Sequence, residues 1–239
     1  MQIHGLNKTT LLDYPEHVAA TIFCGGCNFR CPFCHNSALV FNPSGQPVIP
    51  EQEILDFLAK RKGILQGVCI TGGEPTLQQD LAEFIYRIKE LGYSVKLDTN
   101  GYRPEVLKRL VEGHLLDYIA MDIKSGPSGY AKAAGLSGGT EKLPMEDFLE
   151  KIRKSVDFIK TCGVQYEFRT TAVKGLHTKE DFCEIGPLIK GCRAYFIQNY
   201  KDSENVMQPG FSSFTREELE EFAGLVRPYA EQVQLRGMD

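Results

Sequence analysis

The chain has 239 residues, of which 42% are hydrophobic and 24% charged, as in an ordinary globular protein. Its net charge of −4 is unlike the basic footprint of nucleic-acid-binding proteins, so we expect no nucleic-acid partner. No apolar run approaches the roughly 18 residues of a membrane span, and the first ten residues lack the apolar core of a signal peptide. We therefore expect a cytoplasmic protein without membrane contact, in which the cysteine content favours metal binding or catalysis over a disulfide framework.

Short apolar strands alternate with amphipathic helices along the chain, which is typical of βαβ units on a parallel sheet. The expected strands are Val18–Phe23, Gly67–Thr71, Ser94–Asp98, Tyr118–Asp122, Tyr166–Ala172, Ala194–Gln198 and Gln232–Leu235. The expected helices are Glu51–Arg61, Leu77–Leu91, Pro104–Val111, Met145–Thr161, Thr178–Leu188 and Thr215–Tyr229. Six repeats and a remnant are too few for a closed eight-stranded barrel, so the pattern predicts an open, partial (β/α)6 TIM-like barrel. With no linker in the pattern, residues 1–239 are expected to form a single domain.

Two long irregular segments, Ser125–Pro144 and Asn199–Phe214, interrupt this alternation. Loops longer than about 12–15 residues in a compact domain are usually functional or disordered. Both segments follow strands, so we expect them on the same edge as the other strand-end loops. A lid and a partner-docking edge are the functional interpretations, and plain disorder is the alternative.

The stretch Phe23–Asn36, FCGGCNFRCPFCHN, places Cys27, Cys31 and Cys34 at C-x3-C-x2-C spacing directly after the first expected strand. Soft thiolates brought together in a loop hold iron–sulfur clusters or zinc. Three cysteines on a [4Fe–4S] cluster leave one iron without a protein ligand, where a small molecule can bind. The alternative is a structural zinc site, with Cys24 as the fourth ligand.

This loop, with the aromatic Phe33 before the last cysteine, resembles the signature of the radical S-adenosylmethionine (SAM) superfamily. The wider string CNFRCPFCHN resembles the activating enzymes of glycyl-radical enzymes. The opening stretch Gly5–Phe23 resembles the branch that activates anaerobic ribonucleoside-triphosphate reductase. The resemblance implies a radical SAM core with the partial-barrel fold, a [4Fe–4S] cluster on the three cysteines, and Cys24 as a bystander.

Polar motifs end the next three expected strands, at the barrel edge where (β/α) enzymes place their sites. They are Gly72-Gly73-Glu74-Pro75, Asp98-Thr99-Asn100-Gly101 and Asp122-Ile123-Lys124. On their own these residues also fit ordinary turns, caps and surface pairs. The resemblance implies that Glu74 receives the methionine amino group of SAM and that Lys124 suits its carboxylate or ribose. It also implies that Asp98, Thr99, Asn100 and Asp122 contact SAM, and that Asp98, Thr99 and Asp122 line a monovalent-cation site, Na⁺ or K⁺.

Further candidate SAM contacts lie beside the cysteines and on later strands. Arg169 stands within a strand, where a buried charge needs a partner, and by resemblance it reaches the ribose or the methionine carboxylate. Gln198 and the following asparagine are expected at the adenosine half, although some relatives carry a histidine near this position. His35 and Asn36 are expected to shape the adenine pocket, and a structural hydrogen bond is the alternative for His35.

The reaction that the resemblance implies begins with one electron from a reduced flavodoxin or ferredoxin. Reductive cleavage of SAM then gives a 5′-deoxyadenosyl radical, which generates a glycyl radical on the partner enzyme. Two alternatives stay within radical chemistry: activation of another glycyl-radical enzyme such as pyruvate formate-lyase, and a small-molecule reaction like that of 7-carboxy-7-deazaguanine synthase. A third alternative is a non-catalytic zinc- or cluster-binding module.

Overall fold

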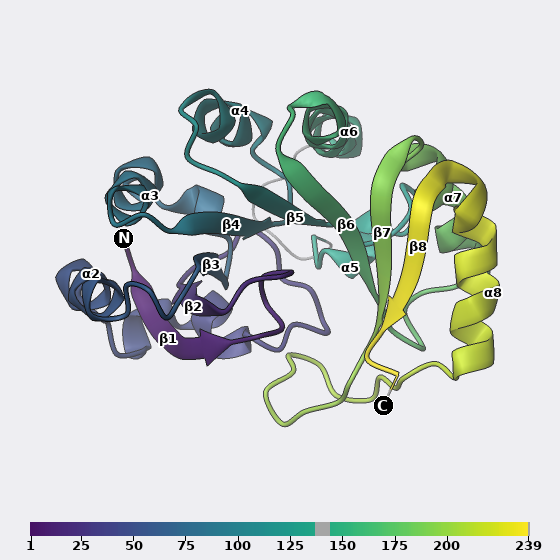
Figure 1. Ribbon diagram of the computed structural model, residues 1–239. Helices are drawn as coiled ribbons and strands as arrows, with labels where there is room; N and C mark the ends of the chain where they lie inside the picture. Colours follow the sequence, from purple (N-terminus) through teal and green to yellow (C-terminus); the bar gives the residue numbers. More distant parts are fainter. Residues whose placement is uncertain (137–143, 239) are drawn as a thin grey trace. The chain divides into compact units, whose positions relative to one another are not determined.

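The computed structural model describes residues 1–136 and 144–238. Its eight strands follow one another in sequence order within one sheet, β1 to β8 (Figure 1). The chain divides into two compact units that interleave along the sequence. The first unit comprises Met1–Asn28, Ala38–Thr99 and Glu105–Ile119, and the second comprises Phe29–Ser37, Asn100–Pro104 and Ala120–Asp239.

The first unit contains the amino-terminal four strands and their helices. Its strands are β1 (Ile3–Thr10), β2 (Ala19–Cys24), β3 (Gly67–Gly72) and β4 (Ser94–Thr99). Its helices are α1 (Ser37–Phe41), α2 (Glu51–Lys60), α3 (Leu81–Glu90) and α4 (Pro104–Glu112), with short 3₁₀ turns η1 (Pro43–Gly45) and η2 (Pro75–Leu77). One residue of α1 and one of α4 fall outside the unit's bounds.

Strands β2, β3 and β4 are parallel, and β1 pairs with β2 in the antiparallel direction. Cys24 at the end of β2 lies opposite Gly72 at the end of β3, so the loops that follow these two strands start side by side. Helices α2 and α3 pack on each other beside these strands (Figure 1). Their buried faces carry Ile54, Leu58 and Phe84, whose helical spacing is what the sequence pattern predicts.

The long segment of the second unit, Ala120–Asp239, begins within β5 (Tyr118–Asp122), which both units share. It continues through α5 (Tyr130–Ala133), α6 (Met145–Thr161), β6 (Gln165–Ala172), α7 (Lys179–Leu188), β7 (Cys192–Asn199), α8 (Arg216–Val226), η3 (Arg227–Tyr229) and β8 (Ala230–Arg236). Strands β6, β7 and β8 are parallel. Helices α7 and α8 pack together through stacked Phe182 and Phe222 rings, whose centroids lie 4.4 Å apart (Figure 1).

The expected α/β class is confirmed, and β5 and α6 have the predicted bounds. Strand β1 was missed, because Ile3–Thr10 contains only two strongly apolar residues and lacks the alternation of a half-buried strand. The helix expected from Leu77 begins at Leu81, because η2 and a turn occupy the residues before it. The segment expected to be irregular from Ser125 contains the short helix α5, and its residues 137–143 lie outside the described residues.

Candidate functional site

The cysteine loop leaves the carboxyl end of β2, and its three predicted ligands fall in both units. Cys27 belongs to the first unit, whereas Cys31 and Cys34 belong to the second. Cys31 is buried, and the other two are partly exposed. None of the eight cysteines forms a disulfide, so the sulfur atoms of all three predicted ligands remain thiols.

In the first unit, the loop after β3 is bound to the backbone just before Cys27. The Gly73 amide donates to Cys24 O and the Glu74 amide donates to Gly26 O, each at 2.8 Å. A Cβ atom on Gly73 would lie 1.9 Å from Gly26 O, so only glycine permits this approach. The contact between Gly73 and Gly26 therefore links the conformation of the Gly72–Glu74 loop to that of the backbone just before Cys27.

The Glu74 carboxylate is 1% exposed and is fixed by two threonines. Its Oε1 accepts hydrogen bonds from the backbone and hydroxyl of Thr76, and from the Thr99 hydroxyl at 2.8 Å. Glu74 thus also caps η2. The fold brings together Glu74 and Thr99, two predicted site residues that are 25 positions apart.

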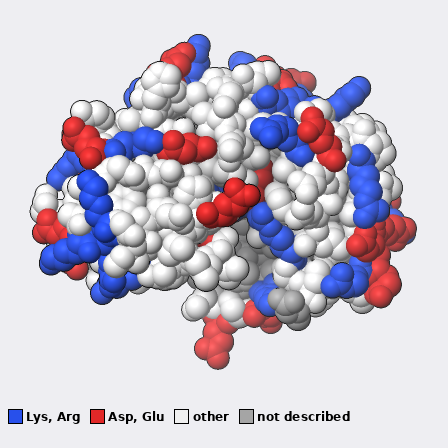
Figure 2. Space-filling model, in the orientation of Figure 1, with Lys and Arg blue, Asp and Glu red and all other residues white. Residues whose placement is uncertain are grey.

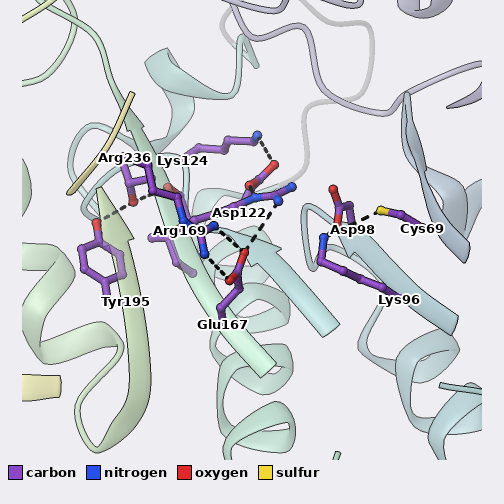
Figure 3. A network of polar contacts seen from close by, with 11 residues as sticks. Cys69, Lys96, Asp98, Asp122, Lys124, Glu167, Arg169, Tyr195 and Arg236 are labelled. Carbon is purple, nitrogen blue, oxygen red and sulfur yellow. Dashed lines mark hydrogen bonds and ion pairs between the residues drawn. The ribbon is translucent and has the colours of Figure 1, made fainter. Parts of the chain in front are cut away.

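Asp98 forms an ion pair with Lys96, whose side chain is only 2% exposed (Figure 3). The Lys96 ammonium also lies 3.7 Å from Cys69 Sγ and 6.0 Å from the centroid of the Tyr118 ring. The sequence analysis missed Lys96. Its i, i+2 spacing from Asp98 puts both side chains on one face of β4, and this was the available signal.

In the second unit, Lys124 and Asp122 act on the electrostatics of both cysteines. Burial raises the pKa of Cys31 to about 11, although the Lys124 ammonium opposes this shift. Burial also raises the pKa of Cys34, against the effects of a hydrogen bond from the Asn36 backbone and of Lys124. The apoprotein thiols are therefore protonated at neutral pH, and a bound metal would displace their protons.

Asp122 lies at the centre of a chain of ion pairs (Figure 3). Its Oδ2 lies 2.9 Å from the Lys124 ammonium, and its Oδ1 accepts a hydrogen bond from Arg169 Nε. Burial alone would raise the pKa of Asp122, but Arg169 and then Lys124 hold it well below its usual range. Burial likewise opposes the charge on Lys124, but the Asp122 carboxylate raises the pKa of that ammonium.

The chain of ion pairs continues through Glu167 to Arg236 on β8 (Figure 3). Arg169 lies 3.9 Å from Glu167, whose two oxygens accept hydrogen bonds from Arg236 at 2.9 Å each. The Arg236 guanidinium stacks over the Phe196 ring, 3.4 Å from its centroid. Sequence reasoning missed Glu167 and Arg236, because neither belongs to a recognisable motif.

His177 was given no role by the sequence, yet it holds the backbone of Lys124. Its Nδ1 accepts from the Val173 amide at 3.1 Å, so its Nε2 carries the proton and donates to Lys124 O at 2.7 Å. Burial lowers the pKa of His177, which favours this neutral tautomer. The ring of Phe33 meets that of His177 edge-on at 6.0 Å, and the Lys124 ammonium lies 6.0 Å from the Phe33 centroid.

The segment from Asn199 to Phe214 is bound to the residues around Cys31 and Cys34. His35 stacks on Tyr200, with ring centroids 5.6 Å apart, and its Nε2 lies 2.7 Å from Lys201 O. The backbone amide of Gln208 donates a hydrogen bond to Pro32 O at 2.9 Å. These contacts favour the structural hydrogen bond for His35, whereas a lid or docking role of the segment stays a prediction.

The remaining predicted residues all belong to the second unit: Gln198, Asn100 and Asn36. Gln198 is partly buried on β7 and pairs in register with Arg236 of β8. Asn100 is buried, and its side-chain oxygen accepts from the Tyr102 amide at 3.0 Å. Asn36 is partly exposed and acts on Cys34 through its backbone.

Within residues 1–136 and 144–238, no group of three or more His, Cys, Asp or Glu side chains is arranged to hold a metal ion. The donor chemistry of the three predicted ligands still fits an iron–sulfur cluster, because all three are thiols outside any disulfide and a fixed cation acts on two of them. The carboxylates predicted for a monovalent cation, Asp98 and Asp122, each have a cationic side-chain partner.

Charges on the face shown in Figure 2 are mixed, with acidic and basic side chains interspersed. This mixture agrees with the small net charge of −4. None of the helices in the described ranges has the length and apolar character needed to cross a membrane.

The sequence model of the radical SAM superfamily matches residues 21–181. A Methanocaldococcus jannaschii protein with the provisional name glycyl-radical enzyme activating enzyme is 33% identical over 238 residues, covering 98% of this chain and 95% of the relative. The pyruvate formate-lyase-activating enzyme of Clostridium pasteurianum is 29% identical over 203 residues, covering 80% of this chain and 77% of that enzyme.

Among solved structures, Streptococcus suis SuiB bound to its precursor peptide SuiA superposes with a TM-score of 0.68 at 15% sequence identity. The superposition covers 91% of this chain and 48% of SuiB, so the chain spans about half the length of that protein. At this identity the likeness concerns the fold alone, and it agrees with the partial-barrel fold that the resemblance implied.

Proposed function

Because the chain belongs to the radical SAM superfamily and is an enzyme of that class, we propose that it generates the glycyl radical of a partner enzyme, an anaerobic ribonucleoside-triphosphate reductase. The observation that carries the proposal is the match to the M. jannaschii protein over nearly the full length of both chains. The likeness of Gly5–Phe23 to reductase activators supports this choice of partner. Membership of an enzyme superfamily sets aside the non-catalytic metal-binding module.

Under this proposal, Cys27, Cys31 and Cys34 hold a [4Fe–4S] cluster, and SAM binds beside them. When bound, the cluster and SAM supply the radical chemistry that removes a hydrogen atom from the Cα of a glycine. The superfamily match contains all three cysteines and the strand-end residues up to Arg169. The protein itself supplies orientation and charge.

Groups suited to SAM occur within each of the two units, taken separately. In the first, the carboxylate of Glu74, held by Thr76 and Thr99, suits the methionine ammonium. In the second, Lys124 is a cation held by Asp122 and suits a carboxylate or ribose. Because these groups are fixed before the ligand binds, little conformational entropy is lost when it is oriented.

The remaining residues complete the proposal. We place the adenine half near Phe33, His35, Asn36 and Gln198, and a monovalent cation near Asp98, Thr99 and Asp122. The electron donor is a flavodoxin or ferredoxin of the cytoplasm, where the eight cysteines, none of which forms a disulfide, stay reduced. Residues 1–239 act as a single radical SAM domain.

The test is an anaerobic assay with purified, reconstituted protein, a chemical reductant and SAM. Iron and sulfide near four each per chain, followed by formation of 5′-deoxyadenosine, are the expected results. Addition of anaerobic ribonucleotide reductase should then give the doublet of a glycyl radical in electron paramagnetic resonance (EPR). Protein that binds zinc without iron, or that forms no 5′-deoxyadenosine, would contradict the proposal.

A second candidate partner is pyruvate formate-lyase, because a relative that matches 80% of this chain is named pyruvate formate-lyase-activating enzyme. The same EPR assay with both partners, each added alone, separates the two. A radical on pyruvate formate-lyase only would reassign the partner. Cleavage of SAM with a radical on neither would favour a small-molecule substrate.

A further inference from the structure

Tyr130, the first residue of helix α5, has a buried hydroxyl that no part of the proposed function uses. The residue is fully buried, at 0% exposure. Within the described parts of the chain its hydroxyl has no acceptor for its proton. A buried hydroxyl whose proton has no acceptor destabilises the folded protein, so its presence suggests a ligand or cofactor that accepts its proton.

Helix α5 is bound to the cysteine loop at the residue before Cys31. The Arg30 amide donates to Ala134 O at 2.9 Å, just beyond the end of α5. Gly135 follows with φ +66°, and a Cβ atom there would lie 1.9 Å from Arg30 O. A residue with a side chain therefore cannot replace Gly135 without separating the two backbones, and the approach of α5 to the loop depends on this glycine.

The ring of Tyr130 is also held in place. It meets Phe148 edge-on with centroids 5.5 Å apart, and Phe148 lies 5.5 Å from Phe29, two residues before Cys31. Phe29 and Phe148 are buried. Because close-packed aromatic rings leave no room for another rotamer, the hydroxyl keeps its position when a cofactor binds.

The side chain of Cys31 contributes to the electrostatic environment of this hydroxyl. Burial raises the pKa of Tyr130, and a hydrogen bond from the Lys124 backbone amide to the phenol oxygen and the Lys124 ammonium oppose that shift, while the phenol proton itself has no acceptor. Cys31 and Asp122 raise the pKa further, so both act on the hydroxyl through the protein interior. The phenol therefore stays protonated and is a hydrogen-bond donor. A metal-bound sulfur is an acceptor that the apoprotein thiol provides only weakly.

We propose that Tyr130 is a positioning residue whose hydroxyl donates a hydrogen bond to the cluster at the sulfur of Cys31. The inference rests on the proposed function, since it needs the cluster on Cys27, Cys31 and Cys34. Hydrogen bonds to cluster sulfurs stabilise the more negatively charged reduced form and raise the reduction potential. Tyr130 thus makes the cluster easier to reduce.

The test compares wild type, Tyr130→Phe and a matched control, Tyr102→Phe. Tyr102 stacks on the same Phe148, and its hydroxyl already accepts from the Lys151 ammonium at 3.3 Å. The reduction potential of each reconstituted protein is measured without SAM, by an EPR-monitored titration with dithionite. We expect a more negative potential for Tyr130→Phe and the wild-type potential for Tyr102→Phe.

The melting temperature of each apoprotein provides a second readout. Because Tyr130→Phe removes a hydroxyl whose proton has no acceptor, its apoprotein should melt at or above the wild-type temperature. A lower melting temperature would mean that the hydroxyl is used by the fold, and an unchanged potential would mean that it does not reach the cluster. Either result overturns the inference. Failure of the wild-type protein to form a cluster would instead overturn the proposed function.

Discussion

The ammonium of Lys124 lies 2.9 Å from Oδ2 of Asp122, two residues earlier at the end of β5. The other oxygen of Asp122 accepts from Arg169, so one carboxylate serves two cations. The three side chains carry a net charge of +1, which suits an anionic group of a ligand. Lys124 is thereby held in place before any ligand binds.

Replacing Asp122 by Asn should destabilise the protein, because it leaves two cations without their shared counter-charge. We expect a loss of about 2–3 kcal/mol at pH 7, somewhat less than for a fully buried pair, since the Asp122 side chain is 27% exposed. Urea denaturation of the apoprotein measures this loss in the free energy of unfolding. Asp157→Asn is the control: Asp157 is 72% exposed and pairs with Lys160, so a change within about 0.5 kcal/mol is expected.

We also expect Asp122→Asn to change how the free energy of unfolding depends on pH. The pKa of Asp122 is lowered in the folded protein, so its contribution is present above the unfolded-state pKa of about 3.9 and is lost as the pH falls through the folded-state pKa. The difference between wild type and Asp122→Asn should therefore be full at pH 6–7 and shrink below about pH 4. Urea denaturation at pH 7, 5 and 3 checks this. A constant difference would show that the charge of Asp122 is not its source.

For the buried ion pair of Lys96 and Asp98, we predict the free energies of unfolding of a single and a double variant. Asp98→Asn leaves the Lys96 ammonium, 2% exposed, without its counter-charge and should cost about 3 kcal/mol. The double variant Lys96→Met, Asp98→Asn should return to within about 1 kcal/mol of wild type, because apolar replacement of a buried pair is often neutral. Chemical denaturation measures both.

The same two variants test the proposed role of Asp98 in SAM binding. If Asp98 contacts SAM, calorimetric titration of cluster-loaded protein should show weaker binding in the double variant even though its stability is restored. Wild-type affinity in that variant would leave Asp98 a purely structural role.

Gly73→Ala should disrupt the loop that precedes Glu74. A Cβ atom at Gly73 would meet Gly26 O at 1.9 Å, so the hydrogen bond from Glu74 N to Gly26 O has to break. We expect a loss of about 2 kcal/mol and weaker SAM binding. Gly224→Ala is the matched control, because a Cβ atom there meets no neighbour within 4 Å in helix α8. That control should gain up to about 1 kcal/mol from helix propensity.

Single replacements of the cysteines should separate ligands from bystanders. Cys27→Ala, Cys31→Ala and Cys34→Ala should each abolish formation of 5′-deoxyadenosine and lower the iron content. Cys24→Ala should keep most of both, because Cys24 is fully buried at the end of β2 and burial raises the pKa of its thiol to about 12. Iron and sulfide analysis with absorption spectra provides the measurement. Full activity in Cys31→Ala would refute the ligand set.

The sequence alone located most elements, because strands and long helices differ in the spacing of their buried residues. In α6, Phe148, Ile152 and Val156 recur at helical spacing, and the predicted bounds agree with the structure. Strand β1 escaped prediction for the same reason, since its central residues are exposed or half-buried and show no alternation. The strand pairs with β2 through its backbone, and this pairing does not require a particular pattern of polar and apolar side chains.

The cysteine spacing and the polar residues that end β3, β4 and β5 are local features, so the sequence by itself determined the class of chemistry. Only the tertiary structure showed that Thr99 binds Glu74, that Arg236 binds Glu167, and that helix α5 brings Tyr130 to the cysteine loop. These partners are separated by many residues, and the type of a polar side chain does not indicate which distant residue it will contact. Which charges neutralise each other depends on strand register and helix packing, and these are set when the chain folds.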